Sequence, residues 1–436
     1  MTETADVVVV GAGVIGTSTA FELAKTGRRV VVVDQLPGPG QGSTGASSAV
    51  VRFNYSTLDG VAASWEAHHH WLNWGDHLEH AADGGPLARL QQTGLVMLDV
   101  PVAPRKRMLE MFDQVGVPYE DWDAETLAAR VPGIDPGRFW PPKRLDDEAF
   151  WAEPDGRLGA FYNPDGGFVD DPQLAAVNLA AAASRRGVTF RFRTVVAGVR
   201  QAGGRVSGLN LASGDVLSAP VVVNVAGPWS SGLNRIAGVG GDFTISVRPM
   251  RQEVHHVPAP PGYNDGDRLG PVIADLDLGT YMRGTPGDGL LVGGTEPECD
   301  PLQWLDAPED AAPNPTVTVY QAQLTRAARR FPGLTIPGTP RGITGVYDVA
   351  SDWTPIYDRT ELDGFYVAMG TSGNQFKNAP LAGRFMAAIV DAVENGRDHD
   401  ADPVRYLGDY TGVKVNLGTF SRRRPVNTAS SGTVMG

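Results

Sequence analysis

The sequence predicts an α/β protein in which a largely parallel βαβ unit receives an inserted antiparallel α+β unit. Three features support this fold class. A buried strand, a glycine-rich turn, a helix and a second buried strand follow each other within residues 5–34. Alternating strands separated by long loops rich in Pro, Asp and Gly extend from Asp242 to about Gly338. A buried-strand pattern then returns in G-F-Y-V-A-M-G, at residues 364–370.

The first feature contains a G-x-G-x-x-G turn between two β-branched runs. Gly11 permits the tight turn, Gly13 lets a pyrophosphate approach the backbone, and Gly16 lets the helix pack closely on the strand. Asp34 ends the second strand and is placed to accept hydrogen bonds from ribose hydroxyls, which disfavours a 2′-phosphate. A glycine-rich turn alone is weak evidence, but here the flanking strands, the helix and the acid agree. The unit predicts a dinucleotide site and does not separate FAD from NAD.

The rest of the chain predicts a helix, a meander and an exposed tail. An Ala-rich helix starts near Pro172, and the runs V-T-F-R-F, V-V-A-G-V-R, V-S-G-L-N-L and V-L-S-A follow at hairpin-like spacing. We expect these four runs to form a small antiparallel meander. An apolar helix after Lys377 completes the first unit. The last residues form an exposed tail in this prediction, with Arg422 to Arg424 solvated.

The composition excludes several classes of partner. The formal net charge of −13 disfavours a general nucleic-acid or anionic-membrane partner. No apolar stretch approaches the ~20 residues that a membrane helix needs, and no basic region precedes the first strand. A cytoplasmic location without membrane contact is therefore the expectation. Cys299 is the sole cysteine, which excludes intrachain disulfides and cysteine-only metal clusters.

Three adjacent histidines, His68, His69 and His70, lie in a segment with helical spacing. Adjacent helical residues point in different directions, so they cannot converge on one ion. We expect partly exposed side chains here and no metal site in the protein.

An ordered set of motifs resembles one known family. The motifs are G-A-G-V-I-G, G-S-T-G-A-S-S, F-Y-N-P-D-G-G-F-V-D, V-V-N-V-A-G-P-W, V-R-P-M-R-Q-E and D-G-F-Y-V-A-M-G-T-S-G-N-Q-F-K-N-A-P. They are similar to those of the FAD-dependent amine and amino-acid oxidoreductases, the D-amino-acid oxidase and glycine oxidase superfamily. Within it, the set looks most like the sarcosine oxidase and dimethylglycine dehydrogenase branch. The resemblance covers nearly the whole chain.

The resemblance implies FAD as the cofactor and a discontinuous organisation of the domains. A Rossmann-like FAD-binding domain of the glutathione-reductase type, a βαβ unit with a meander, would carry an inserted substrate domain built on an antiparallel sheet. The expected segments are 1–85, 150–240 and 340–415 for the FAD-binding domain, 86–149 and 241–339 for the substrate domain, and 416–436 for a C-terminal tail.

The resemblance also assigns contacts to FAD. The Ser-rich loop would cover the pyrophosphate and the flavin, Val195 or Val196 would contact the adenine through the backbone, and Gly227 with Pro228 would lie against the dinucleotide. The full expected set is Gly11, Gly13, Val14, Ile15, Gly16, Asp34, Gln35, Ser43, Thr44, Ser47, Ser48, Val195, Val196, Gly227, Gly373, Asn374, Gln375, Phe376 and Lys377.

The sequence departs from the family pattern where those enzymes attach FAD and where they activate oxygen. No cysteine lies near Gly345, where monomeric sarcosine oxidases attach FAD, and the anchoring histidine of dimethylglycine dehydrogenase has no counterpart. We therefore expect FAD to be bound non-covalently. The oxygen-activating lysine of the G-L-K-L-G segment is replaced in G-L-L-V-G at residues 289–293, and the following histidine becomes Thr295. Oxygen or another electron acceptor therefore remains open, and a dehydrogenase becomes a candidate.

Two cations are the expected catalytic and substrate-binding residues. S-G-N-Q-F-K matches the family's S-G-H-G-F-K, whose lysine binds the substrate carboxylate, and V-V-R supplies Arg52 where the family has I-I-R. Arg52 would hold a carboxylate by a bidentate fork and Lys377 as a point charge. Their field would lower the pKa of a bound amine and stabilise an anionic reduced flavin. The alternatives are a structural arginine and a surface lysine, although a cation is unfavourable at a helix N-terminus.

Three further residues complete the expected substrate-binding set. Tyr281 and Arg283, in G-T-Y-M-R, lie where residues of the family's substrate sheet reach the pocket, and Gln375 precedes Lys377 by two positions. A plain role in the sheet is the alternative for Tyr281 and Arg283.

Together the motifs imply oxidation of the C–N bond of a secondary or tertiary amino acid, N-methylated or cyclic. Hydride transfer to flavin N5 would give an imine that hydrolyses in water. One alternative is a D-amino-acid or 2-hydroxy-acid dehydrogenase on the same scaffold. Another is an FAD-carrying subunit of a multi-protein electron-transfer complex. A homo-oligomer is compatible with the sequence, which does not specify the oligomeric state.

Overall fold

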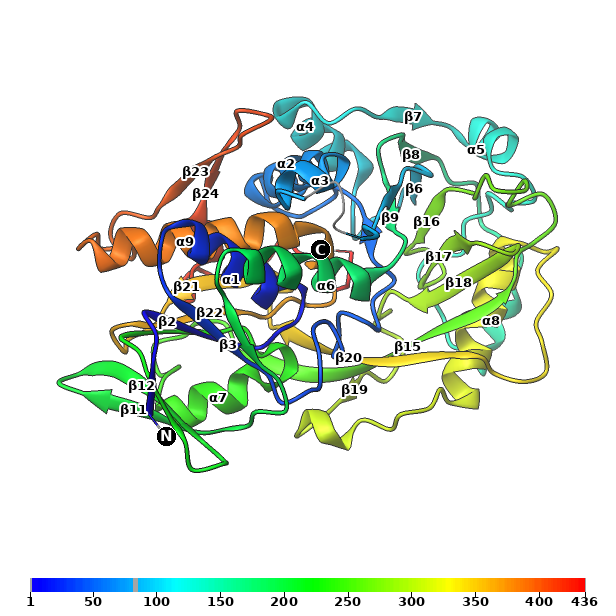
Figure 1. Cartoon of the computed structure of the whole chain (residues 1–436). Coiled ribbons are helices and arrows are strands. Elements are labelled where there is room, and N and C mark those ends of the chain that lie inside the picture. Colours follow the sequence, from blue (N-terminus) through cyan, green and yellow to red (C-terminus); the bar gives the residue numbers. More distant parts are fainter. Residues whose placement is uncertain (1, 81–84, 436) are drawn as a thin grey trace.

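The computed structural model describes residues 2–80 and 85–435; residues 1, 81–84 and 436, which fall in the expected segments 1–85 and 416–436, lie outside this description. Within the described residues, the two largest sheets have six and nine strands and lie in different halves of the molecule (Figure 1). The first is mostly parallel and carries the N-terminal βαβ unit, whereas the second is mostly antiparallel. This confirms the predicted α/β fold with an antiparallel second unit.

The parallel sheet is buried on both faces. In spatial order its strands are β10 (Thr189–Arg191), β3 (Val30–Val33), β2 (Val7–Val10), β14 (Val221–Asn224), β22 (Phe365–Met369) and β21 (Ile356–Arg359). All neighbouring strands are parallel except β21, which is antiparallel to β22. Val7 and Val9 pack in one apolar cluster, and Val8 and Val10 pack in another on the opposite face. Burial on both faces explains the uninterrupted valine runs.

Two layers cover this sheet. One is a row of helices with α1 in the middle (Figure 1): α1 (Val14–Lys25), α6 (Pro172–Arg185) and α9 (Ala379–Glu394). The other combines α7 (Ser230–Ala237) with a small sheet of β1 (Thr2–Thr4), β13 (Val216–Ser218), β12 (Arg205–Leu211) and β11 (Val196–Ala202). The helix predicted near Pro172 begins at that residue, and the side chain of Asp171 caps it by accepting from Leu174 N at 2.8 Å.

The predicted meander contains one strand fewer than expected. β11, β12 and β13 pair antiparallel in sequence order, as the hairpin spacing predicts. The first of the four runs forms β10 instead, which joins the edge of the parallel sheet beside β3. The reason is that β10 directly follows α6, and a strand after such a crossover helix returns parallel to the sheet that the helix covers.

The antiparallel sheet is longer and reaches back to the first unit. In spatial order its strands are β19 (Gln303–Trp304), β15 (Val247–Pro258), β18 (Gly289–Gly294), β17 (Thr280–Thr285), β16 (Val272–Asp275), β6 (Leu95–Leu98), β8 (Ala160–Asn163) and β7 (Glu120–Trp122), with β20 (Gly342–Ala350) also paired to β15. β8 and β20 come from the segments 150–240 and 340–415, which the sequence assigned to the FAD-binding domain. Figure 1 shows β15 and β20 running between the two halves.

Shorter elements complete the chain. Helices α5 (Ala124–Arg130) and α8 (Val317–Arg330) pack on the outer face of the antiparallel sheet. The remaining elements are α2 (Leu58–Leu72), α3 (Trp74–His77), α4 (Arg105–Val115), β4 (Val50–Val51), β5 (Leu90–Gln91), β9 (Gly167–Val169), β23 (Arg405–Leu407), β24 (Lys414–Asn416), and the 3₁₀ turns η1 (Glu148–Trp151), η2 (Gly227–Trp229), η3 (Pro308–Asp310), η4 (Phe376–Asn378) and η5 (Leu417–Phe420). Among the described residues, every helix is too short or too polar to span a bilayer.

The three adjacent histidines lie in α2, and two of them are more buried than expected. His68 and His70 are buried and His69 is half-buried, because α2 packs against α4 and α9. The ring of His68 stacks on Trp65 at 5.1 Å between centroids, and burial lowers its pKa to about 3. In the part of the chain that the structure describes, no group of His, Cys, Asp and Glu side chains could hold a metal ion.

The prediction of an exposed, solvated tail is wrong for Arg422 and Arg424, whereas Arg423 is exposed as predicted, with 49% of its side chain accessible. Arg422 is fully buried and pairs with Asp242 at 2.8 Å, Asp358 at 3.1 Å and Asp400 at 2.7 Å. Arg424 is also buried and pairs with Asp352 at 2.8 Å. These acids compensate charges that would be costly to bury alone.

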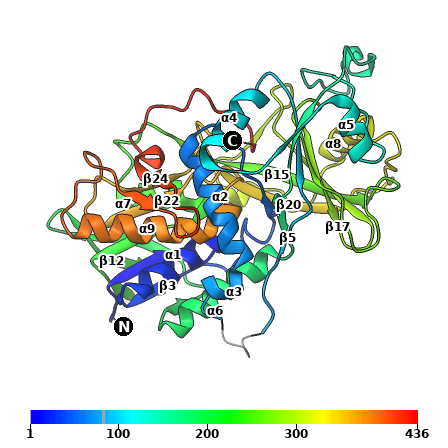
Figure 2. The same ribbon diagram turned by 90° about the horizontal axis from the view of Figure 1, so that it is seen from above.

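The segment after these arginines turns inward. In Figure 2 the red trace runs from beside β24 toward the middle of the molecule. Val434 and Met435 are buried there, with 7% and 6% of their surface exposed. The segment therefore contributes to the interior of the protein.

Candidate functional site

A cavity of about 750 Å³ opens where the parallel strands end and the antiparallel sheet begins. Val10, Val33 and Val225, at the carboxyl ends of β2, β3 and β14, form part of its wall. In open α/β sheets, ligands bind beyond the carboxyl ends of the strands. Every residue that the sequence assigned to the cofactor lines this cavity: Gly11, Gly13, Val14, Ile15, Gly16, Asp34, Gln35, Ser43, Thr44, Ser47, Ser48, Val195, Val196, Gly227, Gly373, Asn374, Gln375, Phe376 and Lys377.

The glycine turn forms a cradle that side chains would fill. Gly11 has a φ of +111°, and a Cβ there would lie 2.3 Å from the carbonyl oxygen of Val225. A Cβ on Gly16 would lie 2.0 Å from the carbonyl oxygen of Gly11, so the helix could not start this close to the strand. Gly13 faces the cavity, and a Cβ there would meet only Thr44 Oγ1, at 3.3 Å. The N-terminus of α1 is thereby open to an anionic group.

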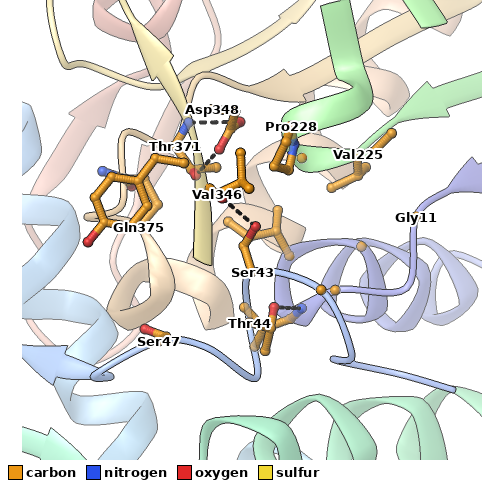
Figure 3. Close-up of a pocket in the computed structure, with 18 of the residues that line it drawn as sticks. Gly11, Ser43, Thr44, Ser47, Val225, Pro228, Val346, Asp348, Thr371 and Gln375 are labelled. Atoms are coloured by element: carbon orange, nitrogen blue, oxygen red, sulfur yellow. Dashed lines mark hydrogen bonds between the residues drawn. The ribbon is translucent and has the colours of Figure 1, made fainter. Parts of the chain in front are cut away.

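The Ser-rich loop, residues 42–48, crosses the cavity between α1 and β20 (Figure 3). The hydroxyl of Ser43 donates to the carbonyl oxygen of Val346 at 2.6 Å. The hydroxyl of Thr44 accepts from the backbone N–H of Val14 at 3.0 Å. These two bonds tie the loop to β20 on one side and to the start of α1 on the other.

Asp34 stands at the end of β3 and is held by the backbone. Its two oxygens accept from Ala12 N at 2.6 Å and from Leu36 N at 2.7 Å. Burial raises its pKa. Each carboxylate oxygen retains a lone pair, so the geometry suits the predicted acceptor for ribose hydroxyls. On the same wall, Gly227 has a φ of +55° and precedes Pro228, which also lines the cavity (Figure 3).

The two predicted substrate-binding cations lie together on the other side of the cavity. Arg52 and Lys377 both line it and are 3% and 2% exposed. The guanidinium of Arg52 lies 5.0 Å and the amine of Lys377 4.9 Å from the centre of the Tyr55 ring. Burial, with the neighbouring charge of Arg52, keeps the pKa of Lys377 well below its usual range. This burial excludes the alternative of a surface charge for Lys377.

Backbone carbonyls, rather than acids, contact these cations. Arg52 donates to Asn54 O and, at 2.5 Å, to Val434 O, and Lys377 donates to Asn374 O at 2.6 Å. Within residues 2–80 and 85–435, neither cation forms an ion pair with a carboxylate. A buried, uncompensated cation is unfavourable. An anionic ligand would remove this cost.

The loop before Lys377 is a network of buried amides. Gln375 donates to Asn374 Oδ1 at 2.6 Å and accepts from the hydroxyl of Tyr357 at 3.1 Å and from Asn378 Nδ2 at 2.9 Å. The polar atoms of Gln375 are thus already engaged by the protein. Gln375 lines the cavity, and its geometry fits a residue that holds the loop in shape.

Tyr281 and Arg283 lie on the same strand but in different surroundings. Tyr281 lines the cavity, its hydroxyl lies 2.6 Å from Ser48 Oγ, and burial raises its pKa to about 12. Arg283 is not part of the cavity wall. Its guanidinium lies 4.0 Å over the ring of Phe168 and donates to Gly284 O at 3.3 Å. The geometry therefore favours the plain role in the sheet for Arg283.

The comparisons with known proteins agree with this geometry. Residues 6–389 match the family model described as DAO, FAD dependent oxidoreductase. The chain belongs to this family. It is 26% identical to a D-amino acid dehydrogenase of Methylobacterium nodulans, over 92% of this chain and 99% of the relative. It is 27% identical to the sarcosine oxidase subunit beta of Rhodobacter capsulatus, over 88% of this chain and 84% of the relative.

Solved structures share the fold. The L-proline dehydrogenase of P. horikoshii superposes with a TM-score of 0.75 at 21% identity, covering 97% of this chain and 98% of that one. The glycine oxidase of Geobacillus kaustophilus superposes with a TM-score of 0.69 at 22% identity, covering 93% and 100%. These likenesses confirm the predicted architecture.

FAD is the cofactor of this family, and the cavity fits it. The open glycine cradle at α1, the loop that ends in Ser48 and the carboxylate of Asp34 supply the anion site, the cover and the ribose acceptor that a dinucleotide needs. Cys299 lies outside the wall, with its sulfur 3.7 Å from Asp300. Leu291, which the sequence analysis aligned with the family's oxygen-activating lysine, also lies outside the cavity wall.

Several residues of the wall escaped the sequence analysis. Among them are Tyr347, Asp348, Thr371, Val434 and Met435. Asp348 is fully buried and accepts from the backbone N–H and the hydroxyl of Thr371 (Figure 3); burial raises its pKa. The spacing of Y-D-V-A gives no local signal for this role. Val434 and Met435 were not expected in the wall because the sequence predicted an exposed C-terminal tail.

Proposed function

We propose that this flavoprotein oxidises the C–N bond of an amino acid whose carboxylate binds Arg52 and Lys377. The most concrete version is a secondary or tertiary amino acid, N-methylated or cyclic. The observation that carries this proposal is the pair of buried cations without an acid, 5.0 Å and 4.9 Å from the same tyrosine ring, on the cavity wall. The names of several relatives, which include sarcosine, glycine and D-amino acids, support the class of substrate.

The residues of the chain can orient such a substrate. Bound FAD supplies the hydride acceptor. Arg52 can engage both carboxylate oxygens, and Lys377 adds a second charge that is fixed by the loop at residues 370–377. Two cations next to the bound amine also lower its pKa, which favours the neutral amine that oxidation requires. Buried rings around the site, including Tyr55 and Tyr281, limit the access of water.

The turn before Lys377 has an unfavourable backbone conformation, which supports a functional role for the residue that it positions. Ser372 and Gly373 both have positive φ, +49° and +67°, and a Cβ on Gly373 would lie 2.3 Å from the ring of Tyr347. A left-handed conformation is unfavourable for serine and is retained where the surroundings require it. We infer that the strained turn places Lys377 against the cavity, with FAD held non-covalently.

The test is anaerobic mixing of the purified protein with a panel of N-methyl, cyclic and D-amino acids and 2-hydroxy acids. The visible flavin band should bleach with one class of amino acid. Slow recovery in air would indicate a dehydrogenase, and fast recovery an oxidase. The release of flavin on acid precipitation checks that it is non-covalent. A protein without a flavin band, or bleaching by none of the carboxylates, contradicts the proposal.

A D-amino acid dehydrogenase is the second candidate. It is supported by the 26% identical relative that covers 92% of this chain. The same panel separates the two candidates, because a D-amino acid with a primary amine would then bleach the band fastest. An FAD-carrying subunit would show no bleaching until its partner chain is added. The location in the cytoplasm and the oligomeric state remain predictions.

A further inference from the structure

The backbone of Val434 bridges Arg52, which lines the cavity, and Glu296, which does not. Its carbonyl oxygen accepts from Arg52 Nη2 at 2.5 Å, and its N–H donates to Glu296 Oε2 at 2.9 Å. The nitrogen, Cα and carbonyl carbon of one residue form the skeleton of an α-amino acid. Val434 and Met435 also line the cavity. The protein's own chain thus lies there as an α-amino acid would, with its nitrogen end on an acid and its carbonyl end on an arginine.

Glu296 has the features of a residue kept for binding. It is buried, it follows β18, and its φ of +51° is in the left-handed region that glycine favours. Its second oxygen, Oε1, has no hydrogen-bond partner among the described residues. Burial raises its pKa to about 8. A buried carboxyl with a free oxygen on a strained backbone is unfavourable for stability, and such groups concentrate at functional sites.

The surroundings of Glu296 connect it to the cavity. Glu296 is not part of the cavity wall, but Tyr281 and Tyr347 are. Burial is the main cause of the raised pKa of both tyrosine hydroxyls, and the nearby charge of Glu296 adds to it. Val434 lies between Arg52 and Glu296, because its backbone is hydrogen-bonded to both side chains. If residues 433–435 moved away, Arg52 and Glu296 would each lose the hydrogen bond to Val434.

We propose that Arg52 and Glu296 are the two ends of an α-amino-acid site, in which Arg52 binds the carboxylate and Glu296 binds an N–H of the amine, and that residues 433–435 fill this site until substrate displaces them. This inference rests on the proposed function and adds the residue that distinguishes an amine from other groups at the same position. A ligand with a carboxylate and an ether oxygen would satisfy Arg52 but would offer Glu296 no hydrogen.

The covering segment, residues 425–435, contains no regular element that its displacement would break. Its root is held by Arg424, which pairs with Asp352 and donates to Thr354 O at 2.6 Å. Beyond this anchor, residues 425–435 form no helix or strand in the structure. Near the anchor, Asn427 donates to Asp352, Ser56 and Thr354. At the far end, Asn54 Nδ2 donates to Met435 O at 3.3 Å, beside the two bonds of Val434.

The experiment measures perturbation of the flavin spectrum by two matched pairs of ligands, with each amine mixed anaerobically. The pairs are sarcosine with methoxyacetate, and L-proline with tetrahydrofuran-2-carboxylate; an ether oxygen replaces the amine in each. The measurement is made at about pH 9, where Glu296 is ionised because its pKa is about 8. In Glu296→Gln, the amines should bind about 10- to 100-fold more weakly, while the ethers change less than about twofold, because one charge-assisted bond is lost. Glu298→Gln, the same change at an exposed residue two positions on, is the control and should match the wild type.

A second variant tests the covering segment, and here amine binding should become tighter rather than weaker. Val434→Pro removes the N–H that Glu296 accepts, so the segment competes less and both amines should bind more tightly than to the wild type. A purely structural role of these residues predicts weaker binding in both Glu296→Gln and Val434→Pro.

Two outcomes overturn the inference in distinguishable ways. If all four carboxylates perturb the flavin and Glu296→Gln weakens amines and ethers equally, Glu296 does not read the amine, while the proposed function stands. If none of the four perturbs the flavin of any variant, the carboxylate site itself is wrong and the proposed function fails with it.

Discussion

Two regions of the molecule bury arginine in opposite ways. Arg330, in α8, is fully buried between Asp275 and Asp277, at 2.8 Å from each. Burial alone would lower its pKa, but the two acids raise it. Arg52 is equally buried, yet backbone carbonyls contact it and burial lowers its pKa. The difference teaches that the fold compensates the first arginine, whereas the second has no acid beside it among the described residues, which fits the anionic ligand that we propose.

The largest effect on stability is expected when Arg330, which compensates two buried acids, is replaced. Arg330→Met leaves Asp275 and Asp277 buried side by side without a cation, so the free energy of unfolding should fall by about 3–5 kcal/mol. Urea unfolding measures this change. Arg138→Met, which removes an exposed pair with Asp155, is the matched control and should change stability by less than about 1 kcal/mol. If the loss of stability in Arg330→Met were no larger than the small loss in Arg138→Met, the buried ion pairs of Arg330 would not stabilise the fold.

Replacement of Arg52 or Lys377 should weaken substrate binding and leave stability unchanged or higher. In Arg52→Met and Lys377→Met, KM for a carboxylate substrate should rise about 10- to 100-fold, since each removes a charged contact. The flavin should remain bound and the melting temperature should stay equal or rise, because no buried acid loses its partner. Steady-state kinetics and thermal unfolding measure both. Lys414→Met, at an exposed lysine, is the control, and a melting temperature that falls as in Arg330→Met would contradict the comparison.

The depressed pKa of Lys377 predicts how carboxylate binding depends on pH. In the free protein, burial and Arg52 disfavour the charged amine, and a bound carboxylate favours it. Binding therefore takes up a proton, and the affinity for acetate should fall as pH rises through the interval between the two pKa values. Acetate is fully ionised above pH ~6, so its own titration does not contribute. In Lys377→Met, the dissociation constant should lose this dependence; an unchanged pH profile would assign it to another group.

The last prediction concerns Glu296 and the pH dependence of the free energy of unfolding. Its pKa in the folded protein is about 8, against an ordinary value of 4.5, so the folded state keeps a proton that the unfolded state has released. Stability must then fall as pH rises from about 4.5 to about 8 and stay constant above. Glu296→Gln lacks this loss, so its melting temperature relative to the wild type should increase across the same interval. A constant difference from pH 5 to pH 9 would contradict the raised pKa.

Local signals predicted much of the fold and of the cofactor site. The valine runs, Gly11, Gly16 and Asp34 act within one βαβ unit of 30 residues, so the sequence alone contains the whole argument. Lys377 could be found because its surrounding motif is contiguous. These parts depend little on contacts with distant segments.

The parts that were wrong or missed depend on partners far away in the chain. Arg422 is buried because Asp242 and Asp358, 180 and 64 residues away, compensate it. Arg283 shares a strand with Tyr281, but the ring of Phe168 from β9 covers it. Val434 reaches the cavity only because the segment before it is anchored inward. Spacing within the sequence does not report such contacts.

The most direct test of the central claim is anaerobic flavin reduction in the wild type and in an Arg52→Met, Lys377→Met double variant. The best amino-acid substrate of the panel is varied in concentration, and the rate of bleaching is followed by stopped flow. The account predicts a normal flavin spectrum in both proteins and a dissociation constant that is raised at least ~100-fold in the double variant. An unchanged dissociation constant would show that the buried cations do not bind the substrate.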